Sequence, residues 1–201
     1  MITTSHLVYN WALAKVTEKT EAAGGMQNNR RLGAFVLGAV LPDLPTYIFF
    51  TYFTFIVGAS QSELWDTLYF DSAWTPFITL SHSFILWPIA LAIGHTLGYR
   101  FLTWLSASAL FHVTLDFFVH AEDAYRHFWP LTDFTFNSPI SYWNPTYYGN
   151  ISSSLDAIIV AILLLWLYRT SVSRTAKYSS LALLILYGLL TFTPLLYTIF
   201  N

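Results

Sequence analysis

Six ionisable side chains lie inside or at the edges of apolar stretches of this chain, where a charge is costly. On insertion scales a charged group at the centre of a membrane helix costs about 2.5–3.5 kcal/mol, so such a residue needs a partner or a purpose. The six residues are His6, Asp43, His82, His112, Asp116 and His120. Imidazole nitrogens and carboxylate oxygens are ligands that zinc accepts without thiolates, and the chain has no cysteine. The residue types therefore predict a site for a divalent metal.

Three of these residues share one short motif, the run FHVTLDFFVH, in which His112, Asp116 and His120 are each four positions apart. At about 100° per residue, positions i, i+4 and i+8 of a helix fall within about 80° of one another. A helix over this run presents the three side chains on one face. A His-x3-Asp pair so arranged can offer a nitrogen and an oxygen to one cation.

The depths of these groups in a bilayer can be counted from the nearest basic residues at about 1.5 Å rise per residue. Asp43 and His112 both come out roughly 18 Å deep, and Asp116 near ~24 Å. The extremes are roughly 14 Å for His6 and roughly 27 Å for His82. Groups from four helical segments thus occupy one middle-to-outer layer, and helices that form a bundle would let them converge.

The composition supports a membrane setting for this chemistry. The chain has 201 residues, of which 55% are hydrophobic and 10% are charged, whereas soluble domains carry about 25% charged residues. These figures argue against a soluble domain, a disordered chain and a nucleic-acid binder. We expect a small all-α polytopic membrane protein with membrane lipids, and no nucleic acid, as its partners.

Hydropathy divides the chain into about five transmembrane helices, because a span needs about 20 mostly apolar residues. The predicted spans are 32–58, 74–97, 101–120, 155–168 and 178–200. Pro42 and Pro45 interrupt the first span, where freed carbonyls must find other donors. A short helix over 5–16 is too short to cross and is predicted to be half-inserted. The whole chain, 1–201, is then one membrane-embedded domain, with a metal-site core over 5–137 and C-terminal helices over 151–200.

The basic residues orient this arrangement. Eight of the nine Lys and Arg residues fall in loops on one predicted side: Lys15, Lys19, Arg30, Arg31, Arg100, Arg169, Arg174 and Lys177. The segments on the opposite predicted side, 59–73 and 121–150, contain Arg126 as their one basic residue. The positive-inside rule therefore predicts a multi-pass protein with its N-terminus on the cytoplasmic side and the aromatic segment 121–150 on the far side. The aromatic residues of that segment that are expected at headgroup level are Trp129, Tyr142, Trp143, Tyr147 and Tyr148.

Four runs in the order LGAVLPDLP, LSHSF, FHVTLDFF and HFWPLTDFTF, within about 5–137, resemble the membrane-bound metal-dependent hydrolase family. Its bacterial members include the YdjM-type inner-membrane proteins, so the resemblance implies a bacterial inner (plasma) membrane. The pattern is also similar to that of the zinc-dependent phospholipase C and nuclease P1 group, which are all-helical enzymes with a cluster of zinc ions.

Carried over residue by residue, the resemblance implies a ligand set for a first metal: Asp43, His82, His112 and Asp116. Asp116 would bridge to a second metal that also uses His6, and His120 would correspond to a ligand of a further metal. The glutamate that completes the third site has no clear counterpart here. Phe134 and Thr135 also stand where a basic residue is often found. One or two Zn²⁺ ions are therefore expected, with another divalent metal as the alternative.

The implied activity is hydrolysis of a phosphoester or ester of a lipid-borne substrate by metal-activated water. Asp43 and Asp116 are the predicted catalytic residues, as bridging ligands and, where one is free, as a base. A non-enzymatic protein is the alternative, in which the cluster lines a metal or proton pathway or braces the bundle. A partner-binding scaffold with a relic site is a third reading. His95, near the end of its span, is predicted to be structural, and His127 is a weaker candidate than the six.

Overall fold

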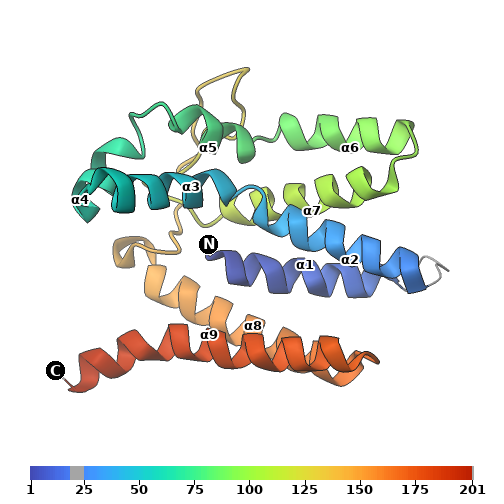
Figure 1. The fold of residues 1–201 in the computed structure, drawn as a ribbon. Helices are drawn as coiled ribbons and strands as arrows, with labels where there is room; N and C mark the ends of the chain where they lie inside the picture. Colours follow the sequence, from blue (N-terminus) through green and yellow to red (C-terminus); the bar gives the residue numbers. More distant parts are fainter. Residues whose placement is uncertain (19–24, 201) are drawn as a thin grey trace.

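The computed structural model describes residues 1–18 and 25–200, with side chains over 1–17 and 29–189, and its regular elements are all helical in this part of the chain (Figure 1). The α-helices are α1 (Thr3–Glu18), α2 (Gly25–Val40), α3 (Leu44–Tyr52), α4 (Gln61–Glu63), α5 (Thr75–Ser81), α6 (Leu86–Thr96), α7 (Arg100–Phe117), α8 (Gly149–Thr170) and α9 (Arg174–Phe200). Short π-helical turns cover Phe53–Val57 and Leu64–Leu68, and a 3₁₀ turn covers Pro145–Tyr147. The predicted all-α class is confirmed.

Helix α7 is the centre of the arrangement. It packs against α2 on one side and α6 on the other, and it also contacts α1. α1 in turn packs against α2 and α8, and α8 and α9 form an antiparallel pair along one side of the molecule (Figure 1). The helix predicted over 5–16 is α1, and its first residues lie in the middle of the bundle rather than at an end.

Two helices are broken in mid-course. α2 and α3 meet at 50° across residues 41–43, and α5 and α6 meet at 48° across residues 82–85. The predicted interruption at Pro42 is confirmed, and its carbonyl accepts a hydrogen bond of 2.7 Å from Ser81 Oγ. The second break was not predicted, since 74–97 reads as one apolar span.

The described helices support part of the predicted five-span arrangement. Within the described residues, α8 is long and apolar enough to cross a membrane by itself, and each bent pair would also qualify if it counts as one span, which makes up to three. Helix α7, predicted as the span 101–120, is less apolar because it carries an inward row of polar side chains. These are Ser106, Ser108, His112 and Asp116, all buried.

Helices α2 and α7 approach closely because the contact is made of small residues. A Cβ at Gly38 would lie 2.4 Å from the Leu105 carbonyl oxygen and 2.6 Å from Ser108 Cβ. The Ser108 hydroxyl reaches both Phe35 O and Asn10 Oδ1 at 2.7 Å. Small residues at such a contact let two backbones come together and exchange hydrogen bonds.

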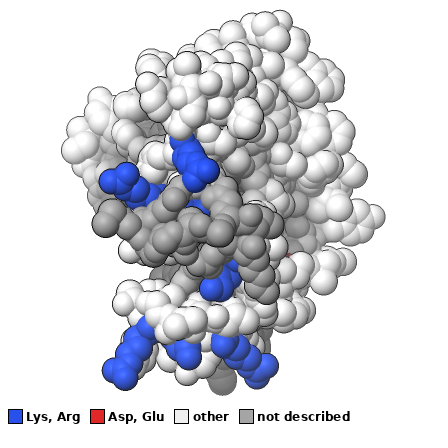
Figure 2. All heavy atoms as spheres, turned by 90° about the vertical axis from the view of Figure 1, so that its right-hand side faces the viewer, with Lys and Arg blue, Asp and Glu red and all other residues white. Residues whose placement is uncertain are grey.

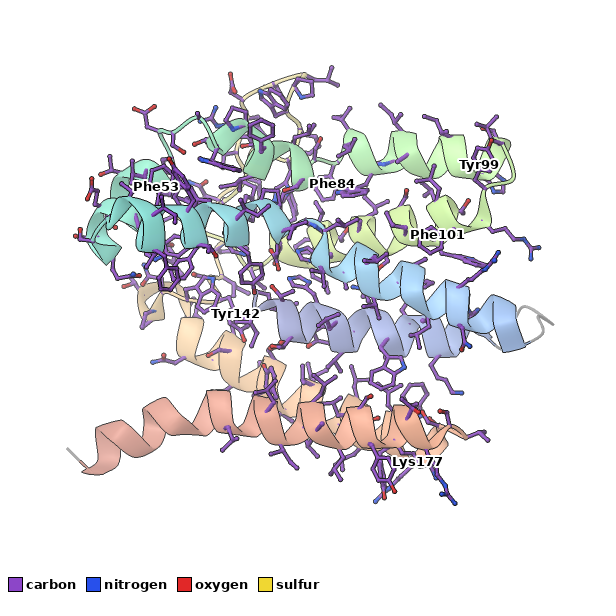
Figure 3. The ribbon with its side chains drawn as sticks, viewed as in Figure 1. Phe53, Phe84, Tyr99, Phe101, Tyr142 and Lys177 are labelled. Carbon is purple, nitrogen blue, oxygen red and sulfur yellow. The ribbon has the colours of Figure 1, made fainter. Side chains whose placement is uncertain are left out.

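A buried carboxylate that the sequence analysis did not single out joins the C-terminal helices to α1. Asp156 of α8 is 5% exposed. Its oxygens accept hydrogen bonds from four hydroxyls: Ser5 (2.6 Å), Tyr9 (2.8 Å), Tyr142 (3.1 Å) and Tyr187 (2.6 Å). Tyr142 was expected at headgroup level, but its ring is buried inside the bundle (Figure 3).

Basic side chains gather at one end of the bundle, near the α6–α7 and α8–α9 turns, and acidic ones are nearly absent from that view (Figure 2). Arg31 departs from the expectation of a loop residue. It is 4% exposed, and its Nη2 donates to the Ala14 carbonyl at 2.7 Å, near the end of α1. Lys19, which the charge count also used, lies outside the described residues.

Replacing Gly38 by alanine is expected to destabilise the protein, because the new methyl meets backbone of α7. Overpacking of this kind costs about 1–3 kcal/mol. Gly33→Ala is the matched control on the same helix, since a Cβ there meets nothing within 4 Å. Thermal unfolding in detergent measures both variants, and equal effects would contradict the close-packing account.

Replacing Asp156 by alanine is expected to loosen the α8–α9 pair from α1, because four hydroxyls, three of them on buried residues, lose their shared acceptor. Each buried group left unsatisfied costs about 1–3 kcal/mol. Hydrogen exchange should rise in α1 and α8, with no such change in Asp66→Ala, an exposed carboxylate. Unchanged exchange in Asp156→Ala would show that the hydroxyl cluster does not hold these helices.

Candidate metal centre

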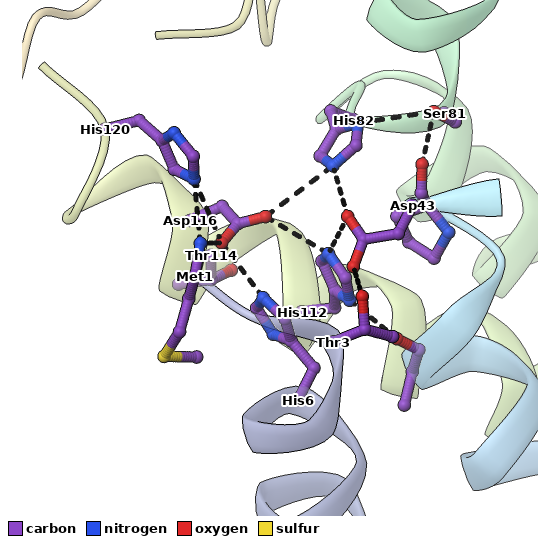
Figure 4. Close-up of polar contacts among 12 residues, drawn as sticks. Met1, Thr3, His6, Asp43, Ser81, His82, His112, Thr114, Asp116 and His120 are labelled. Carbon is purple, nitrogen blue, oxygen red and sulfur yellow. Dashed lines mark hydrogen bonds and ion pairs between the residues drawn. The ribbon is translucent and has the colours of Figure 1, made fainter. Parts of the chain in front are cut away.

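Four buried side chains from three parts of the chain converge beside the C-terminal turns of α7 (Figure 4). His112 and Asp116 lie on α7, Asp43 lies at the break between α2 and α3, and His82 lies at the break between α5 and α6. One ligand atom from each lies within 4.8 Å of the others, a spacing that could hold a metal ion. The helix breaks thus bring two donors to the pair that α7 presents one turn apart.

The distances among these donors suit a small tetrahedral cation. They are 3.5 Å from His82 Nε2 to Asp43 Oδ1, 3.6 Å from His82 Nε2 to Asp116 Oδ2, 3.5 Å from His112 Nε2 to Asp43 Oδ1, and 3.1 Å from His112 Nε2 to Asp116 Oδ2. Ligands about 2.0–2.1 Å from a tetrahedral centre lie roughly 3.3–3.4 Å apart. These four donor–donor distances are therefore close to those expected around zinc, and all the donor atoms lie within 4.8 Å of one another.

Three of the four donor atoms are buried without a hydrogen-bond partner: His82 Nε2, His112 Nε2 and Asp116 Oδ2. A buried polar atom without a partner is costly and rare in folded proteins. Here the three atoms face the same point, so one shared cation would satisfy all of them. Their chemistry fits a metal better than it fits a self-contained hydrogen-bond network.

The helix breaks also orient the imidazoles. The Ala39 carbonyl accepts from His112 Nδ1 at 2.8 Å, and the Ile78 carbonyl lies 3.0 Å from His82 Nδ1. A carbonyl can only accept, so each Nδ1 carries a proton, and in the neutral ring Nε2 is then the nitrogen with the free lone pair. This is the tautomer that a metal-binding histidine needs, held by an outer partner.

Asp43 is oriented from α1. Thr3 Oγ1 lies in hydrogen-bond contact with Asp43 Oδ2 and is 2.7 Å from the Tyr47 hydroxyl. This contact uses one carboxylate oxygen and leaves Oδ1 facing the two imidazoles. Thr3 was not predicted as a site residue, and nothing in its local sequence would have marked it.

The other oxygen of Asp116 faces a second group of donors, so that Asp116 lies between the two groups. Its Oδ1 is 3.0 Å from His6 Nε2, 3.5 Å from His120 Nε2 and 2.8 Å from the amino group of Met1. Met1 also lies 2.8 Å from His120 Nε2. The structure therefore places His6 and His120 beside Asp116, next to the first group.

His120 is backed by a carboxylate. Asp123 Oδ2 lies 2.6 Å from His120 Nδ1. Burial opposes ionisation of Asp123, but its hydrogen bond to His120 and the positive charge there hold the pKa of Asp123 below its usual value. His120 and Asp123 are three positions apart in the sequence, a spacing that permits such a pair. Asp123 was not predicted as a site residue, because it falls in the segment that was expected at the membrane surface.

The segment that follows α7 packs against His82. The Tyr125 ring stacks on the His82 ring at 3.7 Å between centroids and 7° between planes. His127 Nδ1 donates to the His82 carbonyl at 2.8 Å. Burial lowers the pKa of His127 to about 4, so this ring is neutral at neutral pH. His127 thus supports a ligand instead of joining the donors, and His95 is exposed on α6, away from them.

No protein-family model, curated protein or solved structure matches this chain.

His112→Ala is expected to abolish tight metal binding, because it removes one of four donors and leaves two buried carboxylates facing each other. Loss of even an outer partner of a metal ligand typically costs 10–100-fold in affinity, so a loss of at least ~100-fold is expected here. Elemental analysis of detergent-purified protein measures it. His95→Ala is the control, and equal metal content in wild type and His112→Ala would contradict the site.

Proposed function

We propose that this chain is a multi-pass, membrane-embedded, metal-dependent hydrolase that acts on a phosphoester or ester of a lipid-borne substrate. The observation that carries the proposal is Asp116, whose two oxygens face two adjacent groups of buried donors. A carboxylate between two such groups could bridge two metal ions, as in a two-metal hydrolytic site. The motif resemblance points to the same chemistry.

Zinc is the metal that the donor set favours. Two imidazole nitrogens and two carboxylate oxygens, without sulfur, form the first group, and the donor spacing suits a tetrahedral ion. A second ion would be held by Asp116 Oδ1 with His6, and His120 lies within reach. A bound zinc ion would supply Lewis acidity and water with a pKa lowered to about 7.

The chain's own residues supply orientation and proton handling. Thr3 and the two freed carbonyls fix Asp43, His112 and His82. The His120–Asp123 pair resembles an imidazole held by a carboxylate, which can carry a proton at Nε2 beside Asp116. If His120 does not bind the metal, its imidazole would be the acid–base group of this site.

The membrane setting of the proposal rests on the apolar helices and on charge. Helix α8 and the two bent pairs supply up to three spans, and α7 would complete the bundle as a polar-lined inner helix. The basic end in Figure 2 would face the cytoplasm under the positive-inside rule. The resemblance adds that this is a bacterial inner membrane.

A transport role is the second candidate, and one observation favours it. His6, Asp116, His120 and Asp123 form a continuous chain of titratable contacts of 2.6–3.5 Å. It runs from buried His6 to Asp123, whose side chain is 27% exposed. Rows of such groups within membrane proteins also serve as ion or proton pathways.

Zinc-loaded protein is expected to hydrolyse a phosphoester, tested with bis(p-nitrophenyl) phosphate and with phosphatidic acid in mixed micelles. Asp116→Asn should lower turnover at least ~100-fold because it removes the charge shared by both donor groups. Asp133→Asn, the same change at an exposed carboxylate, should have no effect. Full metal occupancy without turnover, together with zinc or proton flux in proteoliposomes, would replace the hydrolase with a transporter.

A further inference from the structure

An apolar pocket of about 530 Å³ lies beside the donor groups, between the end of α7, the segment before α8, and α8 itself. Its volume is within the range of about 300–1,000 Å³ that small-molecule sites occupy. The α7 side of the pocket is formed by Leu115, Phe118 and Val119, and the α8 side includes Ile151, Leu155 and Ile159. Neither the sequence motifs nor the site described above assign it a role.

The last turns of α7 separate this pocket from the donor groups. Leu115 and Val119 line the pocket, whereas His112 and Asp116 face the donors. Positions four apart share a helix face, and adjacent positions are about 100° apart. Met1 lies at the junction, because it lines the pocket while its nitrogen is 2.8 Å from Asp116 Oδ1. A molecule in the pocket therefore has its end within reach of the site.

The pocket presents no free charge to a ligand. Asp156 is its one ionisable carboxylate, and both of its oxygens already accept hydrogen bonds from hydroxyls. Two of those donors, Tyr9 and Tyr142, also line the pocket and direct their hydroxyls to Asp156. Their rings remain as apolar surface. A polar or ionic ligand would find nothing to bind here.

The mouth of the pocket faces the surface that α8 presents outward. Ile151, Leu155 and Ile159 are 58%, 54% and 45% exposed, and they belong to the helix that is long and apolar enough to cross a membrane by itself. Outward apolar side chains on such a helix are in contact with lipid tails. In the membrane setting proposed above, the pocket would therefore open sideways to hydrocarbon and not to water.

We propose that this pocket binds one hydrocarbon chain of a membrane lipid and thereby places the polar end of that lipid at the His/Asp donors. The first half of the proposal, chain binding, rests on the pocket and on the proposed membrane setting, and it does not depend on the hydrolase activity. The second half rests on the proposed function, for which it defines the substrate as a lipid that enters sideways from the bilayer and is recognised by its apolar chain.

The test is photo-crosslinking in vesicles of phosphatidylethanolamine and phosphatidylglycerol that contain a trace of phosphatidylethanolamine with a diazirine on one acyl chain. Mass spectrometry should locate label on Leu115 and Val119 in the full-length protein. Leu155→Trp, which fills the mouth, should reduce this label roughly tenfold because apolar burial of the chain is lost. Ile158→Trp is the matched control, since Ile158 is equally exposed on α8 but does not line the pocket.

The outcomes separate this proposal from the hydrolase. His112→Ala should lose metal while the label on Leu115 persists, because the pocket contains none of the four converging donors. Label on Leu115 no stronger than on lipid-facing Ile162, or unchanged in Leu155→Trp, would overturn the chain-binding proposal whatever the metal content. Crosslinks from the pocket to a second copy of the protein would also overturn it.

Discussion

Two carboxylates and two imidazoles buried together in an apolar bundle are the constraint on which the rest of this structure depends. One ligand atom from each of the two aspartates and two histidines lies within 4.8 Å of the others. At this spacing the two carboxylates repel each other unless positive charge lies between them. The surrounding helices supply hydrogen-bond partners to the polar atoms of these side chains that point away from the centre of the cluster. Asp43 Oδ2 and both Nδ1 atoms have partners, whereas the atoms that face one another are left for a cation.

The irregular parts of the fold follow from the same constraint. A helix break in an apolar setting is costly, because it frees carbonyls that water cannot reach. In this chain the breaks after α2 and α5 each bring one donor, Asp43 or His82, and each frees a carbonyl that orients an imidazole. The close α2–α7 contact at Gly38 brings Ala39 near enough to His112 for that bond. The helix breaks and the small residues at the α2–α7 contact therefore position the ligands together.

The sequence predicted those features that depend on local pattern. The interruption at Pro42 follows from the chemistry of proline, and the shared face of His112 and Asp116 follows from helix periodicity. The break at His82 was not predicted, because Ser81, His82 and Ser83 form a short polar run inside a stretch that is otherwise apolar enough to be one span. Asp156, Thr3 and Tyr125 act only through tertiary contacts with residues far along the chain, and no spacing in the sequence reveals such contacts. Of the five predicted spans, α8 is apolar enough by itself, whereas inward-facing polar side chains lower the hydropathy of α7.

The most direct test of the central claim is X-ray absorption spectroscopy of the zinc-loaded protein in detergent. The account predicts a first shell of nitrogen and oxygen at about 2.0–2.2 Å, with the outer scattering of two imidazole rings and no sulfur. A spectrum with no imidazole scattering, typical of zinc bound by water and surface carboxylates, would contradict it.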